Sequence, residues 1–123
     1  MWSLLFIVFL ILHAAIHVAI WATPKPGDAK MPFDAAHSWL LGNQRALAVA
    51  LALAAAALLL TAAVGLMAHG EWWRPVAVAG LAVSFVLMVV YFHPWFLFAQ
   101  ALNAALILAI VWLNWPSQAM VGA

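Results

Sequence analysis

The chain has 123 residues, of which 71% are hydrophobic and only 6% are charged. A soluble domain of this length needs a polar exterior to cover its core, so the composition predicts a membrane protein. The net charge of +1, from 4 Lys and Arg against 3 Asp and Glu, excludes the basic patch that a nucleic-acid partner requires. Without cysteine, any metal site must use histidine, carboxylate or amide groups.

Apolar residues form four segments, each close to the ~20 residues that a helix needs to cross a ~30 Å hydrocarbon core. Tryptophans lie at the segment ends or in the long connection, as is typical of side chains drawn to the headgroup region. The sequence therefore predicts an all-α protein, a four-helix transmembrane up-down bundle of the bacterial inner membrane. The bundle forms a single domain over 1–123, with helices at about 2–22, 45–68, 73–92 and 95–115.

The first segment carries the most informative pair of residues. His13 and His17 are four residues apart, which places both imidazoles on one face of a helix. A polar ring at membrane depth costs free energy unless it is hydrogen-bonded, ligated or turned into a protein-lined cavity. The pair is therefore a functional-site hypothesis.

The long connection between the first two segments, 23–44, contains most of the charged residues. Its first half is rich in proline and glycine. Its second half predicts a short interfacial helix at about 34–41, with Asp34 as N-cap and Gly42 at the C-terminal stop. His37 falls within this expected helix.

Small residues predict how the middle segments pack. The second segment has Ala50, Ala54, Ala57, Thr61 and Gly65 at steps of three and four, a spacing that lets helix backbones approach closely in lipid, so we expect this segment to be central. The third segment offers Ala77, Gly80 and Ser84 for the same purpose. We expect the hydroxyls of Ser84 and Thr61 to bond to carbonyls of their own helices.

Helix arithmetic brings further polar groups to the depth of the histidine pair. With a rise of 1.5 Å per residue, His13 lies within ~2 Å of the predicted midplane and His17 ~7 to 8 Å toward the long connection. Gln100 and Asn103 of the fourth segment lie at about the depths of His17 and His13. The sequence thus predicts a pocket on this side of the bilayer that binds a ligand through His13, His17, Gln100, Asn103 and Tyr91, with His13, His17, His37 and His93 as the candidate metal ligands.

The histidine pair has alternative interpretations. Both rings can simply form interhelical hydrogen bonds, to Gln100, Asn103 or a backbone carbonyl, each worth around 0.6 to 2 kcal/mol. Alternatively they ligate a metal ion or a haem, because histidine is the commonest metal ligand, or they line a path for protons or a substrate. No further metal-ligating residues occur at the spacing of a known metal-binding motif, so the sequence leaves these interpretations open.

Four short motifs resemble one group of proteins. They are LHAAIH at 12–17, SWLLG at 38–42, EWW at 71–73 and NAALIL at 103–108. The chain resembles uncharacterised small bacterial four-helix integral membrane proteins with an N-terminal LHGLIHL-like segment, although it has Ala14 and Ala15 where glycine and leucine are common. The resemblance implies the four-helix fold and draws attention to His13 and His17, but it implies no activity.

Three functions remain for a chain of this kind. The first is a small membrane protein whose histidine-lined pocket binds a metal ion, haem or another small ligand. The second is a structural or accessory subunit of a larger respiratory or photosynthetic membrane complex; the third is a proton-coupled carrier or a metal-dependent membrane enzyme. No nucleophile–base pair or nucleotide-binding motif favours an enzyme. Besides the lipid bilayer, the sequence leaves open a homo-oligomer as the partner.

Overall fold

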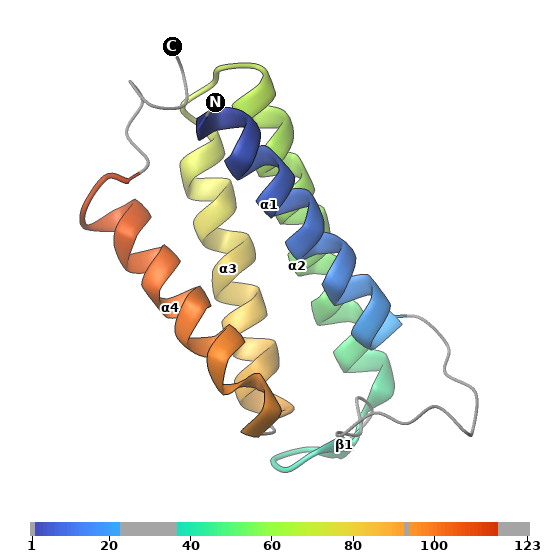
Figure 1. Cartoon of the computed structure of the whole chain (residues 1–123). Helices are drawn as coiled ribbons and strands as arrows, with labels where there is room; N and C mark the ends of the chain where they lie inside the picture. Colours follow the sequence, from blue (N-terminus) through green and yellow to red (C-terminus); the bar gives the residue numbers. More distant parts are fainter. Residues whose placement is uncertain (1, 23–36, 93, 116–123) are drawn as a thin grey trace.

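The computed structural model describes residues 2–22, 37–92 and 94–115. Its elements confirm the predicted all-helical fold, since each predicted segment contains one of four α-helices (Figure 1). These are α1 (Trp2–His17), α2 (Arg45–Met67), α3 (Trp73–Val90) and α4 (Leu97–Val111). A π-helical turn, Val18–Ala22, continues α1, and a 3-10 turn, Pro94–Phe96, precedes α4.

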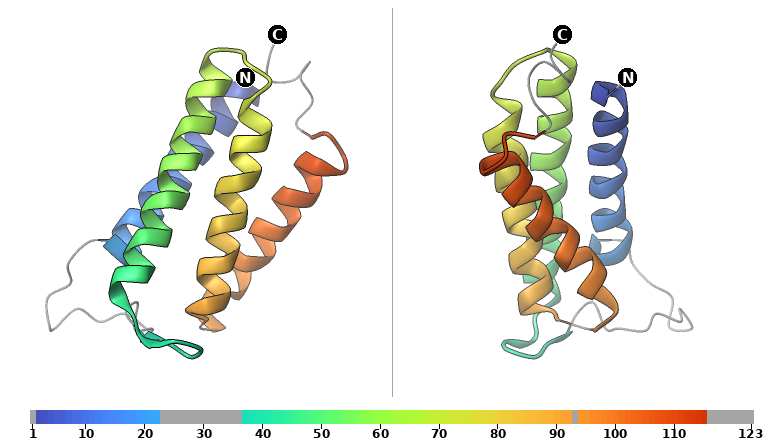
Figure 2. Two further views of the ribbon diagram at one scale, coloured as in Figure 1. Left: turned by 180° about the vertical axis from the view of Figure 1, so that it is seen from behind. Right: turned by 60° about the vertical axis from the view of Figure 1, so that its left-hand side comes forward.

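The helices follow one another in space as they do in sequence. α2 packs against both α1 and α3, and α4 packs against α3. Figure 2 shows α4 on the far side of α3 from α2, and α1 along the face where α2 and α3 meet. Two helices, α2 and α3, are long and apolar enough to cross a membrane, whereas α1 and α4 are apolar but shorter.

The tight turn between α2 and α3 is a Schellman motif. The Gly70 amide donates to the Gly65 carbonyl at 2.9 Å, and the His69 amide donates to the Leu66 carbonyl at 3.1 Å. His69 holds the left-handed position, with φ of +56°, where glycine is more common. The motif satisfies carbonyls at the end of α2 and reverses the chain within a few residues.

The central position of α2 is confirmed, but the face that we expected to pack is wrong. Ala50, Ala54, Ala57 and Thr61 are exposed. Of the five expected residues only Gly65 is buried. The buried face otherwise consists of different alanines and of leucines, namely Ala48, Ala52, Ala55, Ala56, Leu59, Ala62, Ala63 and Leu66. Alanine occurs all around this helix, so its spacing does not select one face. On α3, the expected residues Ala77, Gly80 and Ser84 are all buried.

The predicted interfacial helix at 34–41 is also wrong over the described residues, 37–41. Two short antiparallel strands, β1 (His37–Ser38) and β2 (Gly42–Asn43), form a hairpin there. The Ser38 hydroxyl accepts hydrogen bonds from the amides of Leu40 and Leu41, both at 3.1 Å, and so competes with helical bonding. Gly42 adopts φ of +76°, which closes the turn instead of ending a helix. Asp34, the expected N-cap, lies outside the described residues.

The hairpin is attached to the end of α3. The Ser38 hydroxyl donates to the carbonyl of Val90, and the Trp39 indole donates to the carbonyl of Val89 at 2.7 Å. Both carbonyls belong to the last turn of α3, where no helical amide can reach them. The Tyr91 hydroxyl donates to the carbonyl of Gln44, which ties the start of α2 to the same place.

Two apolar clusters fill the bundle, and a polar layer separates them. The first cluster includes Ala14 of α1, Leu81 of α3 and Ile110 of α4; the second includes Trp21, Leu87 and Phe96. Between the two clusters, α1, α3 and α4 each carry one buried polar residue: His17, Ser84 and Asn103. This layer contains one of the two histidines of the predicted site.

Candidate functional site

His17 is hydrogen-bonded through both of its ring nitrogens. Nδ1 lies 2.8 Å from the His13 carbonyl oxygen, and Nε2 lies 2.7 Å from the Ser84 hydroxyl. Because a carbonyl only accepts, Nδ1 carries the proton, and in the neutral ring Nε2 is then the acceptor. The Ser84 hydroxyl therefore donates to His17, whose side chain is only 1% exposed.

Asn103 completes a chain of hydrogen bonds across three helices. Its amide nitrogen donates to the Ser84 oxygen at 2.9 Å, and this oxygen has already used its one proton on His17. The direction of all three bonds is thus consistent, from Asn103 to Ser84, to His17 and to the backbone of His13. The amide oxygen of Asn103 is buried without a hydrogen-bond partner among the described residues.

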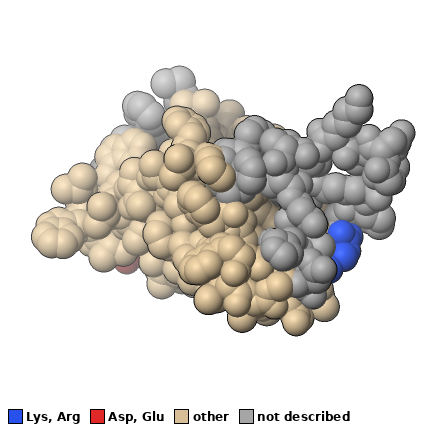
Figure 3. Space-filling model, turned by 90° about the horizontal axis from the view of Figure 1, so that it is seen from below, with Lys and Arg blue, Asp and Glu red and all other residues tan. Residues whose placement is uncertain are grey.

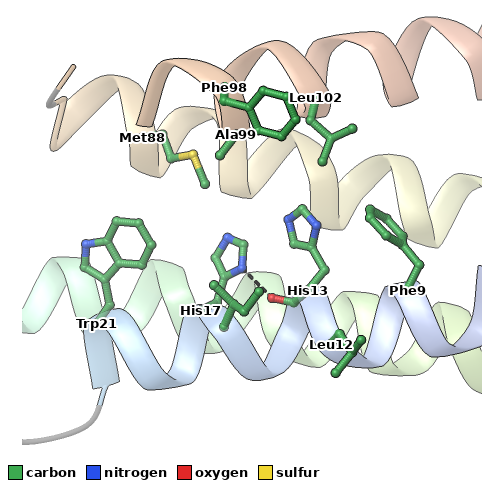
Figure 4. A pocket seen from close by; sticks show the side chains of 10 residues that line it. Phe9, Leu12, His13, His17, Trp21, Met88, Phe98, Ala99 and Leu102 are labelled. Carbon is green, nitrogen blue, oxygen red and sulfur yellow. Dashed lines mark hydrogen bonds between the residues drawn. The ribbon is translucent and has the colours of Figure 1, made fainter. Parts of the chain in front are cut away.

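His13 is the counterpart of His17 and differs from it in hydrogen bonding. Its ring stacks on that of His17 at a centroid distance of 4.9 Å with an interplanar angle of 18°. Phe9 packs on it edge-on at 5.4 Å. Within the described part of the chain, neither ring nitrogen of His13 has a hydrogen-bond partner. The ring points away from α1 into a space bordered by α4 (Figure 4).

That space is a pocket of about 520 Å³ between α1, α3 and α4. Met88 lines it from α3, and Phe98, Ala99 and Leu102 line it from α4. The remaining lining residues come from α1 and its π-helical turn: Phe9, Leu12, His13, Ile16, His17 and Trp21. Apart from the two histidines and the Trp21 indole, no side chain in this lining carries a nitrogen or oxygen, so the pocket is mainly apolar rather than the polar pocket we expected.

The structure brings only part of the predicted site together. His13 and His17 line the pocket, and Asn103 reaches His17 through Ser84. Gln100 instead donates to the Phe85 carbonyl at 3.2 Å and borders a separate hollow of about 320 Å³, with Trp39, Val89 and Phe92. The hydroxyl of Tyr91 bonds to the backbone of Gln44, and Tyr91 does not line the pocket.

Sequence reasoning missed Ser84, because its hydroxyl was expected to bond within α3. It instead bridges His17 and Asn103. Thr61 does behave as expected and donates to the Ala57 carbonyl at 2.7 Å. A usable signal was present, since Ser84 continues the step of small residues through Ala77 and Gly80 that was expected to face a neighbouring helix.

The expected metal site does not form from the described residues. A metal lies in the plane of each imidazole that ligates it, and the nearly parallel, stacked rings of His13 and His17 share no such point. His17 has in addition both nitrogens engaged. No group of three histidine or acidic side chains comes together within the described residues. His93 and the side chain of His37 lie outside what the structure describes.

Charge is nearly absent from the helices. The charged residues within the described ranges are Arg45, Glu71 and Arg74, which lie at the first residue of α2, in the turn, and at the second residue of α3. The face seen from the hairpin end shows mostly uncharged residues where it is described (Figure 3). The interior of every helix, and with it the pocket, is free of charged side chains.

Comparison with protein families, with curated proteins and with solved structures gives no match. The function of the protein must therefore be inferred from its fold, its pocket and the contacts of the two histidines.

Proposed function

We propose that this chain is an integral protein of the bacterial inner membrane whose four helices all cross the bilayer, and that it binds a small ligand in the pocket between α1 and α4. The observation that carries the ligand proposal is the contrast in hydrogen bonding between the two histidines. His17 is held by the fold, whereas His13 presents ring nitrogens without a partner among the described residues to an apolar cavity.

Membrane insertion is supported by the lengths of the helical runs and by their charges. α2 and α3 meet the length of a span directly. The π-helical turn extends the run of α1 to Ala22, and the 3-10 turn starts that of α4 at Pro94, so both approach the ~20 residues of a crossing. Charged side chains of the described residues lie only at helix ends or in the turn, where they reach the headgroup region.

A ligand is supported by the cost of leaving His13 as it is. An imidazole in hydrocarbon without a hydrogen-bond partner is destabilising by on the order of 1 to 3 kcal/mol. Helix packing alone explains His17, but it supplies no partner to the ring of His13 within the described residues. A bound molecule with one hydrogen-bonding group satisfies that ring and fills the cavity.

The test compares the wild-type protein with Ala99→Phe, which places a ring inside the pocket. Both proteins are purified from membranes in mild detergent, extracted with organic solvent and examined by mass spectrometry. We expect a molecule that accompanies the wild type at fixed stoichiometry and is lost from Ala99→Phe. Exposed Ala50→Phe is the matched control and should retain it. Identical extracts from all three proteins would contradict the ligand proposal.

The second candidate function is a subunit of a larger membrane complex. It is favoured by the sparse packing of α4, which among the described helices packs closely only against α3 and is followed by the exposed side chains of Trp112 and Leu113. A subunit should co-purify with other chains at fixed ratios in mild detergent. A monodisperse particle of this chain alone would argue against it.

A further inference from the structure

The pocket opens sideways, on the outer surface of the bundle. Three apolar residues that line it are largely exposed: Leu12 by 57%, Ile16 by 55% and Phe98 by 81%. They belong to the outward faces of α1 and α4 rather than to the turns at the ends of the bundle. In the proposed membrane placement this opening faces lipid chains, so an occupant enters from the hydrocarbon and not from water.

The depth of His13 limits which membrane molecule can satisfy it. The helical run from Trp2 to Ala22 puts His13 eleven residues from one end and nine from the other. At 1.5 Å per residue the ring lies roughly 14 to 16 Å from either end, near the middle of a ~30 Å core. Phospholipid headgroups stay at the edges of that core, and their acyl chains carry no group that bonds to an imidazole.

The walls of the pocket favour a flat ring. Along α1 the rings of Phe9, His13, His17 and Trp21 follow one another at centroid distances of 5.4, 4.9 and 5.7 Å. Phe98 lies across from them on α4 (Figure 4). Aromatic faces and edges attract a further ring by about 0.5 to 1.5 kcal/mol beyond simple burial. A flexible alkyl chain gains nothing comparable from these walls.

We infer that the occupant is a lipid-soluble planar ring that bears oxygen, of the quinone or quinol type, held between the aromatic walls with its oxygen hydrogen-bonded to His13. This inference rests on the proposed function. A neutral imidazole has one donor and one acceptor nitrogen, so His13 donates to a ring carbonyl or accepts from a ring hydroxyl. Both oxidation states of such a molecule therefore fit the same side chain, and no chemical step is required of the protein.

The experiment uses the full chain, labelled with ¹⁵N-histidine, in lipid nanodiscs. A decyl-substituted benzoquinone is titrated in, and its matched hydrocarbon, decylbenzene, serves as the probe without oxygen. We expect the quinone to shift the ring nitrogen signals of His13 in a saturable way, while those of exposed His69 stay in place. Decylbenzene should leave the His13 nitrogens unbonded and shift them little. The His13→Phe variant assigns the signals by their loss.

Two variants keep the result interpretable. Leu12→Trp adds bulk at the exposed rim, where it is not expected to disturb folding, and Ala99→Phe fills the interior; both should abolish the quinone shift. One outcome is that quinone and decylbenzene shift the His13 signals equally, or that neither shifts them, while the extracted molecule is still lost from Ala99→Phe. The pocket then binds another class of ligand, and this inference fails while the proposed function stands. A His13 shift that follows the phospholipid composition instead of the quinone overturns it too. If extracts and spectra are both unchanged by Ala99→Phe, the proposed function fails as well.

Discussion

α2 and α3 meet through glycine and alanine, whereas α1 and α4 face each other across a pocket. At the first interface, Gly80 of α3 lies against Leu58 and Leu59, so closely that an added Cβ would come within 3.0 to 3.1 Å of their atoms. On the other side, Phe9 and Phe98 line the pocket together with leucine and isoleucine. Small residues let backbones approach, while large ones hold them apart and leave space between their ends.

The same contrast separates the two histidines. Both rings line the pocket, but His17 is also bonded to the packed part of the bundle, where Ser84 of α3 reaches it and Asn103 of α4 completes the layer. His13, one turn earlier, points to the open side. An i, i+4 pair on one helix face therefore does not make one site here. One ring is part of the structure of the bundle, and the other is the group available for binding.

The largest effect should come from adding bulk where α2 and α3 are packed most closely. A Cβ at Gly65 would lie 2.9 Å from the Cβ of Trp73 and 3.1 Å from its Cα, which is backbone and yields little. We expect Gly65→Leu to destabilise the bundle by about 3 kcal/mol by overpacking, less ~1 kcal/mol regained from helix propensity. Thermal unfolding in detergent, followed by circular dichroism, measures this. Ala50→Leu, on the exposed face of α2, should unfold like the wild type, and equal losses in both variants would reverse our assignment of the buried face.

The next effect should come from the polar layer. Ser84→Ala leaves Nε2 of His17 without a partner and leaves the Asn103 amide with only its weak bond to the Met88 sulfur at 3.9 Å, so we expect a loss of about 1 to 2 kcal/mol. Thr61→Val is the matched control, because Thr61 bonds only within its own helix on the exposed face. A double-mutant cycle with Asn103→Leu should show coupling, since Ser84 connects the two helices. If the stability losses of the two single variants simply add in the double variant, the hydrogen bond between Ser84 and Asn103 does not contribute to stability.

These two predictions also show what the sequence could and could not establish. Apolar length predicted all four helices, because each apolar segment is close in length to the ~20 residues expected of a membrane-crossing helix, and each contains one helix of the structure. The polar site depends on how helices approach each other, which no single segment encodes. Ser84 and Thr61 are alike in sequence context, yet only Ser84 reaches another helix. The hairpin was missed for a related reason, since Ser38 and Trp39 gain their partners from the end of α3.

A smaller effect should distinguish the two histidines directly. His17→Phe removes the imidazole from the polar layer and should cost about 1 kcal/mol. His13→Phe loses no hydrogen bond to a described side chain and removes an imidazole that has no partner there, so the ligand-free variant should be at least as stable as the wild type. In ¹⁵N spectra of the imidazoles, His17 should be the Nδ1-protonated tautomer, as its bond to the His13 carbonyl requires. A His17 ring protonated only on Nε2 would contradict the hydrogen-bond chain, and equal destabilisation by both substitutions would contradict the division between packed and open sides.

The smallest effect should arise at the hairpin, which is bonded to the end of α3. The Trp39 indole donates to the Val89 carbonyl and also borders the hollow next to Gln100 on α4. Trp39→Phe keeps an aromatic ring there but removes the donor, and the side chain is largely exposed, so we expect a loss of only ~0.5 kcal/mol. Amide hydrogen exchange in detergent should speed up in the last turn of α3 and at the hairpin, while α1 stays unchanged. Exchange that rises equally in α1 would show that the hairpin supports the pocket as well, and that the two sides of the bundle are not independent.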